Sequence, residues 1–180
     1  MRPERTRGIQ TSALLVSAAF GAVQSLLFVA LVPVTTVLAV SSPPAYALVA
    51  SIHGLMPFLA RVITRTPGMA TFTAFVTGLL TSAVSPIGPL AAVPMMLAGI
   101  ALDLSLPLRR GQQPTAARIL LAGAIVGVVL FFVALPVFSP DHLVPPVLLA
   151  TLAARIVGEL VIASVVIALR RLLTRAGVAR

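Results

Sequence analysis

The chain has 180 residues, of which 59% are hydrophobic and only 9% are charged, so it has too little polar surface to cover a soluble domain. Its net charge of +9 comes from arginines grouped in short clusters between apolar runs, and not along one stripe as in a nucleic-acid-binding protein. The absence of cysteine excludes disulfides, thiolate metal sites and cysteine nucleophiles.

Long apolar segments follow one another along the whole chain. A bilayer core of about 30 Å needs about 20 helical residues, so segments of that length bounded by arginine, proline or glycine predict membrane spans. The predicted spans are 10–32, 44–63, 68–84, 88–106, 115–138 and 144–173. The first apolar stretch is longer than the core of a signal peptide, which favours a membrane span over a cleaved leader. We therefore expect an all-α integral membrane protein, a compact bundle of about six transmembrane helices in a single domain.

The arginines predict the orientation of this bundle. Twelve of the thirteen fall at the N-terminus, at the C-terminus or in every second connection between spans. The intervening connections, 33–43, 85–87 and 139–143, contain no arginine. By the positive-inside rule, both termini are expected in the cytoplasm of a multi-pass protein of the cell membrane. Pro57 and Pro94 interrupt two of the spans and predict kinks there.

The thirteenth arginine, Arg155, lies near the middle of the last span. Glu159 follows four residues later, so the two side chains share one face of the helix. A lone charge at the centre of a membrane helix costs about 2.5–3.5 kcal/mol, so the two must either neutralise each other or face a polar cavity. The sequence leaves open an ion pair that only orders the bundle and a pair that lines a ligand pocket.

Other polar residues within the spans are weaker candidates. Asp103 lies close to the predicted cytoplasmic interface, six and seven residues before Arg109 and Arg110, and is expected to pair with an arginine. His53, near the outer face, could donate to a ligand or to a backbone carbonyl, and Gln24 could bond a neighbouring helix or a ligand.

Two steps of small residues predict close helix packing. Ala18 and Ala22 form one in the first span, and Gly123 and Gly127 form the other in the fifth. Each step could pack inside the bundle or dock a partner helix.

Motifs of catalysis are missing from the sequence. It contains no phosphate-binding Gly-x-x-x-x-Gly-Lys loop, no His-Glu-x-x-His pair and no Gly-x-Ser-x-Gly turn. A helix-borne serine beside His53 is conceivable without motif support. We therefore expect no enzyme activity, no catalytic residue, no bound metal and no cofactor.

Three segments resemble the substrate-binding S components of energy-coupling factor (ECF) vitamin transporters, most closely the hydroxymethylpyrimidine/thiamine branch. They are Arg61 to Gly68 (RVITRTPG), Gly99 to Asp103 (GIALD) and Ala168 to Val178 (ALRRLLTRAGV). The resemblance covers most of the chain through the order and spacing of these segments. It implies a six-helix subunit with cytoplasmic termini that captures a vitamin or vitamin precursor from outside.

The resemblance also implies partner subunits, and the chain differs from the thiamine branch at some positions. A separate transmembrane coupling subunit and two ATPase subunits would supply the energy, and the family's small-residue docking step would correspond to Ala18 and Ala22. Thiamine-type pockets favour aromatic stacking, whereas this chain has no tryptophan and a single tyrosine, Tyr46. Asp103 stands where that branch often has a longer acid.

The predicted pocket lies in the outer half of the membrane, between the later helices. Arg155 and Glu159 would form its deep polar wall, with Gln24, His53 and Tyr46 as further contacts. The proline-rich segment from Pro33 to Tyr46 is expected to be a loop that closes over the ligand. Two alternatives to a substrate-binding subunit are a scaffold or accessory subunit of another membrane complex and a small secondary transporter.

Overall fold

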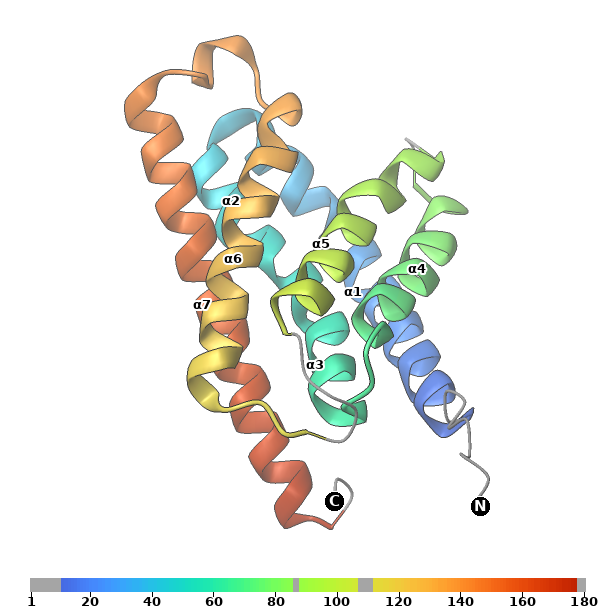
Figure 1. The fold of residues 1–180 in the computed structure, drawn as a ribbon. Helices are drawn as coiled ribbons and strands as arrows, with labels where there is room; N and C mark the ends of the chain where they lie inside the picture. The colour runs from blue at the N-terminus through green and yellow to red at the C-terminus, as the bar shows by residue number, and fades with distance from the viewer. Residues whose placement is uncertain (1–10, 86–87, 107–111, 178–180) are drawn as a thin grey trace, which may run out of the picture.

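The computed structural model describes residues 11–85, 88–106 and 112–177, and within these ranges all regular structure is helical. The N-terminal arginines, Arg109, Arg110 and Arg180 lie outside the described residues. The elements, shown in Figure 1, are α1 (Thr11–Ser41), α2 (Pro43–Ala50), η1 (Ser51–Gly54), α3 (Leu55–Thr64), α4 (Met69–Ser82), η2 (Gly88–Ala91), α5 (Ala92–Ser105), α6 (Ala116–Ala134), η3 (Leu135–Val137), η4 (Pro140–His142) and α7 (Pro145–Arg175).

The helices form the membrane bundle that the composition predicts. Five apolar helical stretches are long enough to cross a bilayer, namely Thr11–Ser41, Pro43–Thr64, Gly88–Ser105, Ala116–Val137 and Pro145–Arg175. A further apolar helix, α4, has 14 residues and brings the number of membrane segments in the described chain to six. The start of α1 and the end of α7 lie at the same end of the bundle (Figure 1). The predicted fold class, an all-α membrane bundle with about six helices, is therefore confirmed.

The segment between the first two spans differs from the prediction. Residues 33–43 were expected to be a loop, but α1 continues through Pro33 to Ser41 and α2 begins at Pro43. The hydroxyls of Thr35 and Thr36 donate to the carbonyls of Leu31 and Val32, at 3.0 and 2.8 Å, and so support the helix beyond the proline. The predicted lid loop is wrong, because its apolar residues and hydroxyls continue the helix.

Both predicted kinks take the form of helix breaks. Pro57 stands in the first turn of α3, directly after the 3₁₀ segment η1, and Pro94 stands in the first turn of α5, after η2. A proline is tolerated in a first turn because its missing N–H would have no intrahelical acceptor there. The second span is therefore discontinuous, with a short 3₁₀ turn between α2 and α3.

Gly99 permits the close packing of α5 against α4. A Cβ added at this glycine would lie 2.8 Å from the Cβ of Ala74 and 2.9 Å from the carbonyl oxygen of Ala70. Both neighbours belong to α4, and one of the two atoms is backbone, so the helices would have to separate to admit a side chain.

We expect Gly99→Ala to destabilise the protein by about 1–3 kcal/mol, the usual cost of overpacking a close contact. The melting temperature in detergent measures the effect, with Leu104→Ala on the same helix as a control because Leu104 is 74% exposed. Equal melting temperatures for Gly99→Ala and the native protein would contradict the packing described here.

Candidate functional site

Arg155 and Glu159 form a buried ion pair on α7. The distance from Arg155 Nη2 to Glu159 Oε1 is 3.4 Å, and the two side chains are 7% and 1% exposed. Arg155 Nη1 also donates to the carbonyl oxygen of Ala47 on α2, at 3.3 Å. The pair thus connects α7 to the first half of the discontinuous second span.

Glycines on two other elements allow the backbone to approach this pair. A Cβ added at Gly54, the last residue of η1, would lie 3.3 Å from Glu159 Oε2. On α6, a Cβ added at Gly127 would lie 3.4 Å from Glu159 Cγ, and one at Gly123 would lie 3.0 Å from the Glu159 carbonyl oxygen. The glycine step of α6 therefore packs inside the bundle, directly against the charged segment of α7.

Tyr46 and His53 lie beside the same arginine. Both interact electrostatically with Arg155. The Tyr46 ring also meets Phe138 edge-on, with ring centroids 5.8 Å apart, and the His53 ring lies 4.9 Å from the ring of Phe28 on α1. Both aromatic rings therefore lie within electrostatic range of Arg155 and pack against a phenylalanine.

Gln24 occupies the neighbouring contact between α1 and α3. Its side chain is fully buried, and its Oε1 accepts a hydrogen bond of 3.1 Å from the backbone N–H of Met56. This bond satisfies one of the free N–H groups in the first turn of α3. The five residues predicted for the site therefore come from four elements: Gln24 from α1, Tyr46 from α2, His53 from η1, and Arg155 and Glu159 from α7.

Several buried polar atoms at this junction have no hydrogen-bond partner among the described residues. They are Gln24 Nε2, His53 Nδ1 and Arg155 Nε, while Glu159 Oε1 has no hydrogen bond beyond its ion-pair contact with Arg155. Leaving such a group unpaired costs about 1–3 kcal/mol, and native proteins contain few of them. A group of several in one place therefore indicates a binding site. The cluster contains hydrogen-bond donors and a carboxylate acceptor, which are the groups that recognise a small polar molecule.

An open groove lies at the end of the bundle opposite the start of α1 and the end of α7. Its volume is about 400 Å³, and it runs between the α1–α2 junction and the start of α7. It is lined by Ser41, Ser42, Pro43, Pro44, His142, Pro146, Val147 and Ala150. Ala47, whose carbonyl oxygen accepts from Arg155, follows the groove residues Pro43 and Pro44 on the same helix, α2.

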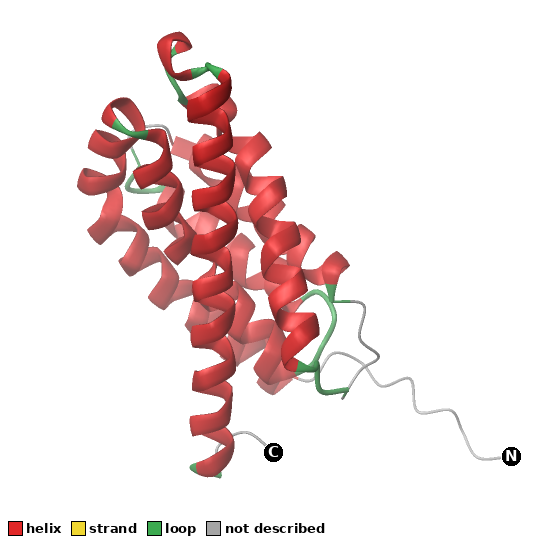
Figure 2. Ribbon diagram, turned by 90° about the vertical axis from the view of Figure 1, so that its left-hand side faces the viewer, coloured by secondary structure: helices red, strands yellow, loops and turns green. Residues whose placement is uncertain are grey.

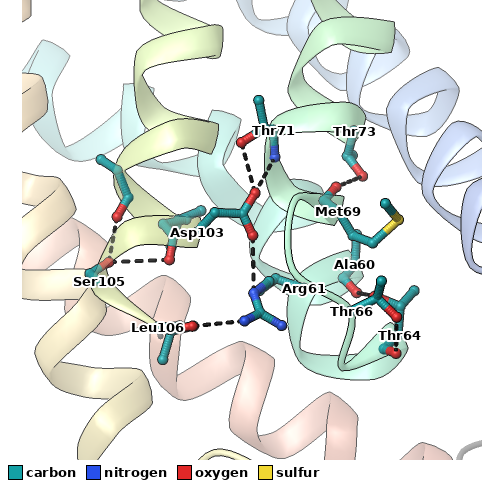
Figure 3. A network of polar contacts seen from close by, with 12 residues as sticks. Ala60, Arg61, Thr64, Thr66, Met69, Thr71, Thr73, Asp103, Ser105 and Leu106 are labelled. Carbon is teal, nitrogen blue, oxygen red and sulfur yellow. Dashed lines mark hydrogen bonds and ion pairs between the residues drawn. The ribbon is translucent and has the colours of Figure 1, made fainter. Parts of the chain in front are cut away.

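A second ion pair, between Arg61 and Asp103, lies where the end of α3, the start of α4 and the end of α5 meet (Figure 3). Arg61 Nε is 3.0 Å from Asp103 Oδ1, and Arg61 Nη2 donates to the carbonyl oxygen of Leu106 at 2.7 Å. Asp103 Oδ2 accepts from the backbone N–H and the hydroxyl of Thr71, at 2.8 and 2.7 Å. Asp103 therefore caps α4 from a neighbouring helix, because the N-cap residue itself is Gly68.

The location of Arg61 corrects one prediction. This residue was grouped with the cytoplasmic arginines that set the topology, but its side chain is only 1% exposed, and it reaches Asp103 and the carbonyl oxygen of Leu106. Asp103 does pair with an arginine, as expected. Its partner is Arg61 from another helix, whereas Arg109 and Arg110 are not among the described residues.

The two small-residue positions of α1 lie partly outside the bundle. Ser17 and Gly21 are buried, and a Cβ added at Gly21 would lie 2.8 Å from Val76 Cβ on α4. One residue further along, Ala18 is half-buried and Ala22 is exposed. The step that packs α1 within the chain is thus Ser17 with Gly21, and the neighbouring face remains available.

Comparison with known proteins identifies the class of this protein. Residues 12–129 match the family described as the permease component of an ABC-type cobalt transport system, and the chain belongs to this family. It is therefore a multi-pass transport protein of the plasma membrane and not an enzyme. No curated protein matches the sequence.

The fold is shared with a solved structure described as the crystal structure of an S component of an ECF transporter. The TM-score is 0.83 at 22% sequence identity, and the match covers 95% of this chain and 88% of that one. The chain therefore has the fold of an ECF S component.

We expect Asp103→Leu to destabilise the bundle by about 3–5 kcal/mol, because it leaves Arg61 buried without its counter-charge and removes the cap of α4. Chemical or thermal denaturation in detergent measures this loss. Asp141→Leu, in the exposed turn η4, is the matched control and should leave stability within about 0.5 kcal/mol of the native value. Similar stability of the two variants would show that the cytoplasmic pair contributes nothing.

Proposed function

We propose that this protein is the substrate-binding subunit of an ECF-type importer and that it captures a vitamin or vitamin precursor related to hydroxymethylpyrimidine or thiamine. A transmembrane coupling subunit and two ATPase subunits would supply the energy. The observation that carries the proposal is the buried Arg155–Glu159 pair, surrounded by unpaired polar atoms in a chain with an S-component fold.

The chemistry around the pair supports a small organic ligand with both donors and acceptors. The Glu159 carboxylate can accept from an exocyclic amine, and the free N–H groups of Arg155 and Gln24 can donate to ring nitrogens or a hydroxyl. Tyr46 and His53 can contact an aromatic ring. An aminopyrimidine such as hydroxymethylpyrimidine combines these features.

The description of the matched family makes Co²⁺ the alternative substrate. Within the described residues, no group of three or more histidine, cysteine, aspartate or glutamate side chains lies close enough to hold a metal ion. The charge of Arg155 at the centre of the cluster also repels a divalent cation. We therefore favour the organic substrate and include the metal in the test.

The test is a ligand panel on the purified protein, with thiamine, hydroxymethylpyrimidine and Co²⁺ added separately. A substrate present at 100 times its Kd should stabilise the protein by about 2.7 kcal/mol, visible as a raised melting temperature. We expect a response to one of the two organic compounds. A response to Co²⁺ alone would favour cobalt transport, and no response to any compound would favour an accessory subunit.

Glu159→Gln tests the role of the carboxylate. We expect it to weaken binding of the responding compound at least tenfold, because a hydrogen bond to a charged group contributes about 1.5–3 kcal/mol. The melting temperature without ligand should also fall, because Arg155 loses its counter-charge, so affinity is measured at a temperature at which the variant remains folded. Asp141→Asn is the control. Unchanged affinity together with a lowered melting temperature would assign Glu159 a structural role.

Docking of the coupling subunit is proposed on the α1 face that contains Ala18 and Ala22. Enlarging Ala22 to phenylalanine should reduce co-purification with a co-expressed coupling subunit, because close helix approach is lost, while ligand affinity stays unchanged. Val37→Phe, at a 66% exposed position near the other end of α1, is the control. If assembly is unchanged with both alanines enlarged, the coupling subunit binds another surface.

A further inference from the structure

A shallow apolar groove follows the outward face of α7. Its volume is about 480 Å³, and its lining comes from one helix: Val157, Leu160, Val161, Ser164, Val165 and Ala168. Val157 and Val161 are 52% and 55% exposed. Figure 2 shows α7 along the near side of the bundle with no helix in front of it. The groove therefore faces lipid in the membrane.

The same helix face continues into two arginines. Arg171 and Arg175 follow Ala168 by three and seven residues, spacings that place them in line with the groove. Both are exposed. Arg170 points elsewhere, because its Nη1 donates to the Pro114 carbonyl oxygen at 2.6 Å. The groove thus has a cationic end, and that end lies at the cytoplasmic surface.

Neither of these two arginines has a carboxylate partner among the described residues. Asp103 pairs with Arg61, Glu159 pairs with Arg155, and Asp141 belongs to η4 at the opposite end of α7. The remaining acid, Glu4, lies outside the described residues. The positive charge at the end of the groove is therefore not neutralised by the described part of the chain.

The length of the groove matches one leaflet of a membrane. From Val157 to Ala168 the helix rises about 17 Å, at about 1.5 Å per residue. Half of a bilayer core is about 15 Å. Arg171 and Arg175 stand about 5 and 10 Å further along the axis, at the depth of the lipid headgroups.

We propose that this face of α7 binds an anionic phospholipid of the cytoplasmic leaflet. One acyl chain lies in the groove, and the phosphate lies between Arg171 and Arg175. Charge complementarity distinguishes this occupant from another apolar helix, which would leave the two guanidinium groups without a counter-charge. This inference is independent of the transported substrate.

Native mass spectrometry of the purified protein, titrated with phosphatidylglycerol or phosphatidylcholine, tests the headgroup. We expect tighter binding of phosphatidylglycerol. The double variant Arg171→Gln/Arg175→Gln should lower that affinity roughly 30-fold, at about fivefold for each arginine near the surface, and leave phosphatidylcholine binding unchanged. Arg118→Gln, an exposed arginine in the first turn of α6, is the charge-matched control and should have little effect.

The groove itself is tested by Ala168→Phe, which should fill it and weaken phosphatidylglycerol binding, with Leu149→Phe in the outer half of α7 as the control. The melting temperature of each variant verifies folding. If the double variant fails to fold, Arg175→Gln alone should show the fivefold effect. Equal affinity for both lipids, equal effects of Arg118→Gln and the double variant, or full binding by Ala168→Phe would overturn the proposal. A dimer that Ala168→Phe disperses would also overturn it, by assigning the groove to a second copy.

Discussion

The cost of placing charges in an apolar interior is the constraint on which this structure depends. An arginine or glutamate without a counter-charge inside a membrane helix is costly, because it loses its hydration and gains no ion pair in return. The described chain meets this constraint twice, with Arg155–Glu159 inside the bundle and Arg61–Asp103 near its cytoplasmic end.

The helix between the two pairs links them. The ten residues of α3 begin directly after Gly54, which lies against Glu159, and its last turn carries Arg61. The 3₁₀ break before α3 allows Gly54 to approach the carboxylate, and the glycines of α6 do the same from the other side. The two pairs therefore fix opposite ends of one short rigid element.

The features that could be predicted from the sequence are those that depend on composition and on the spacing of residues along a helix. Hydropathy and arginine spacing indicated the membrane bundle, and the four-residue spacing of Arg155 and Glu159 indicated their pairing on one face. The segment 33–43 was mistaken for a loop because prolines are helix breakers in water, whereas hydroxyls such as those of Thr35 and Thr36 support the helix here. The partner of Asp103 could not be predicted, since the sequence offers Arg61, Arg109 and Arg110 near the same predicted interface, and the pairing with Arg61 depends on how α3 packs beside α5.

The central claim, that the buried pair recognises the substrate, is tested most directly by Arg155→Met/Glu159→Leu. Replacing both charges with apolar side chains of similar size removes recognition without leaving either charge unpaired, and such replacements are often neutral or stabilising. Calorimetric titration of this variant with the compound that stabilises the native protein is the measurement. We predict a folded protein with no detectable binding. Native affinity in the folded variant would contradict the assignment of the site.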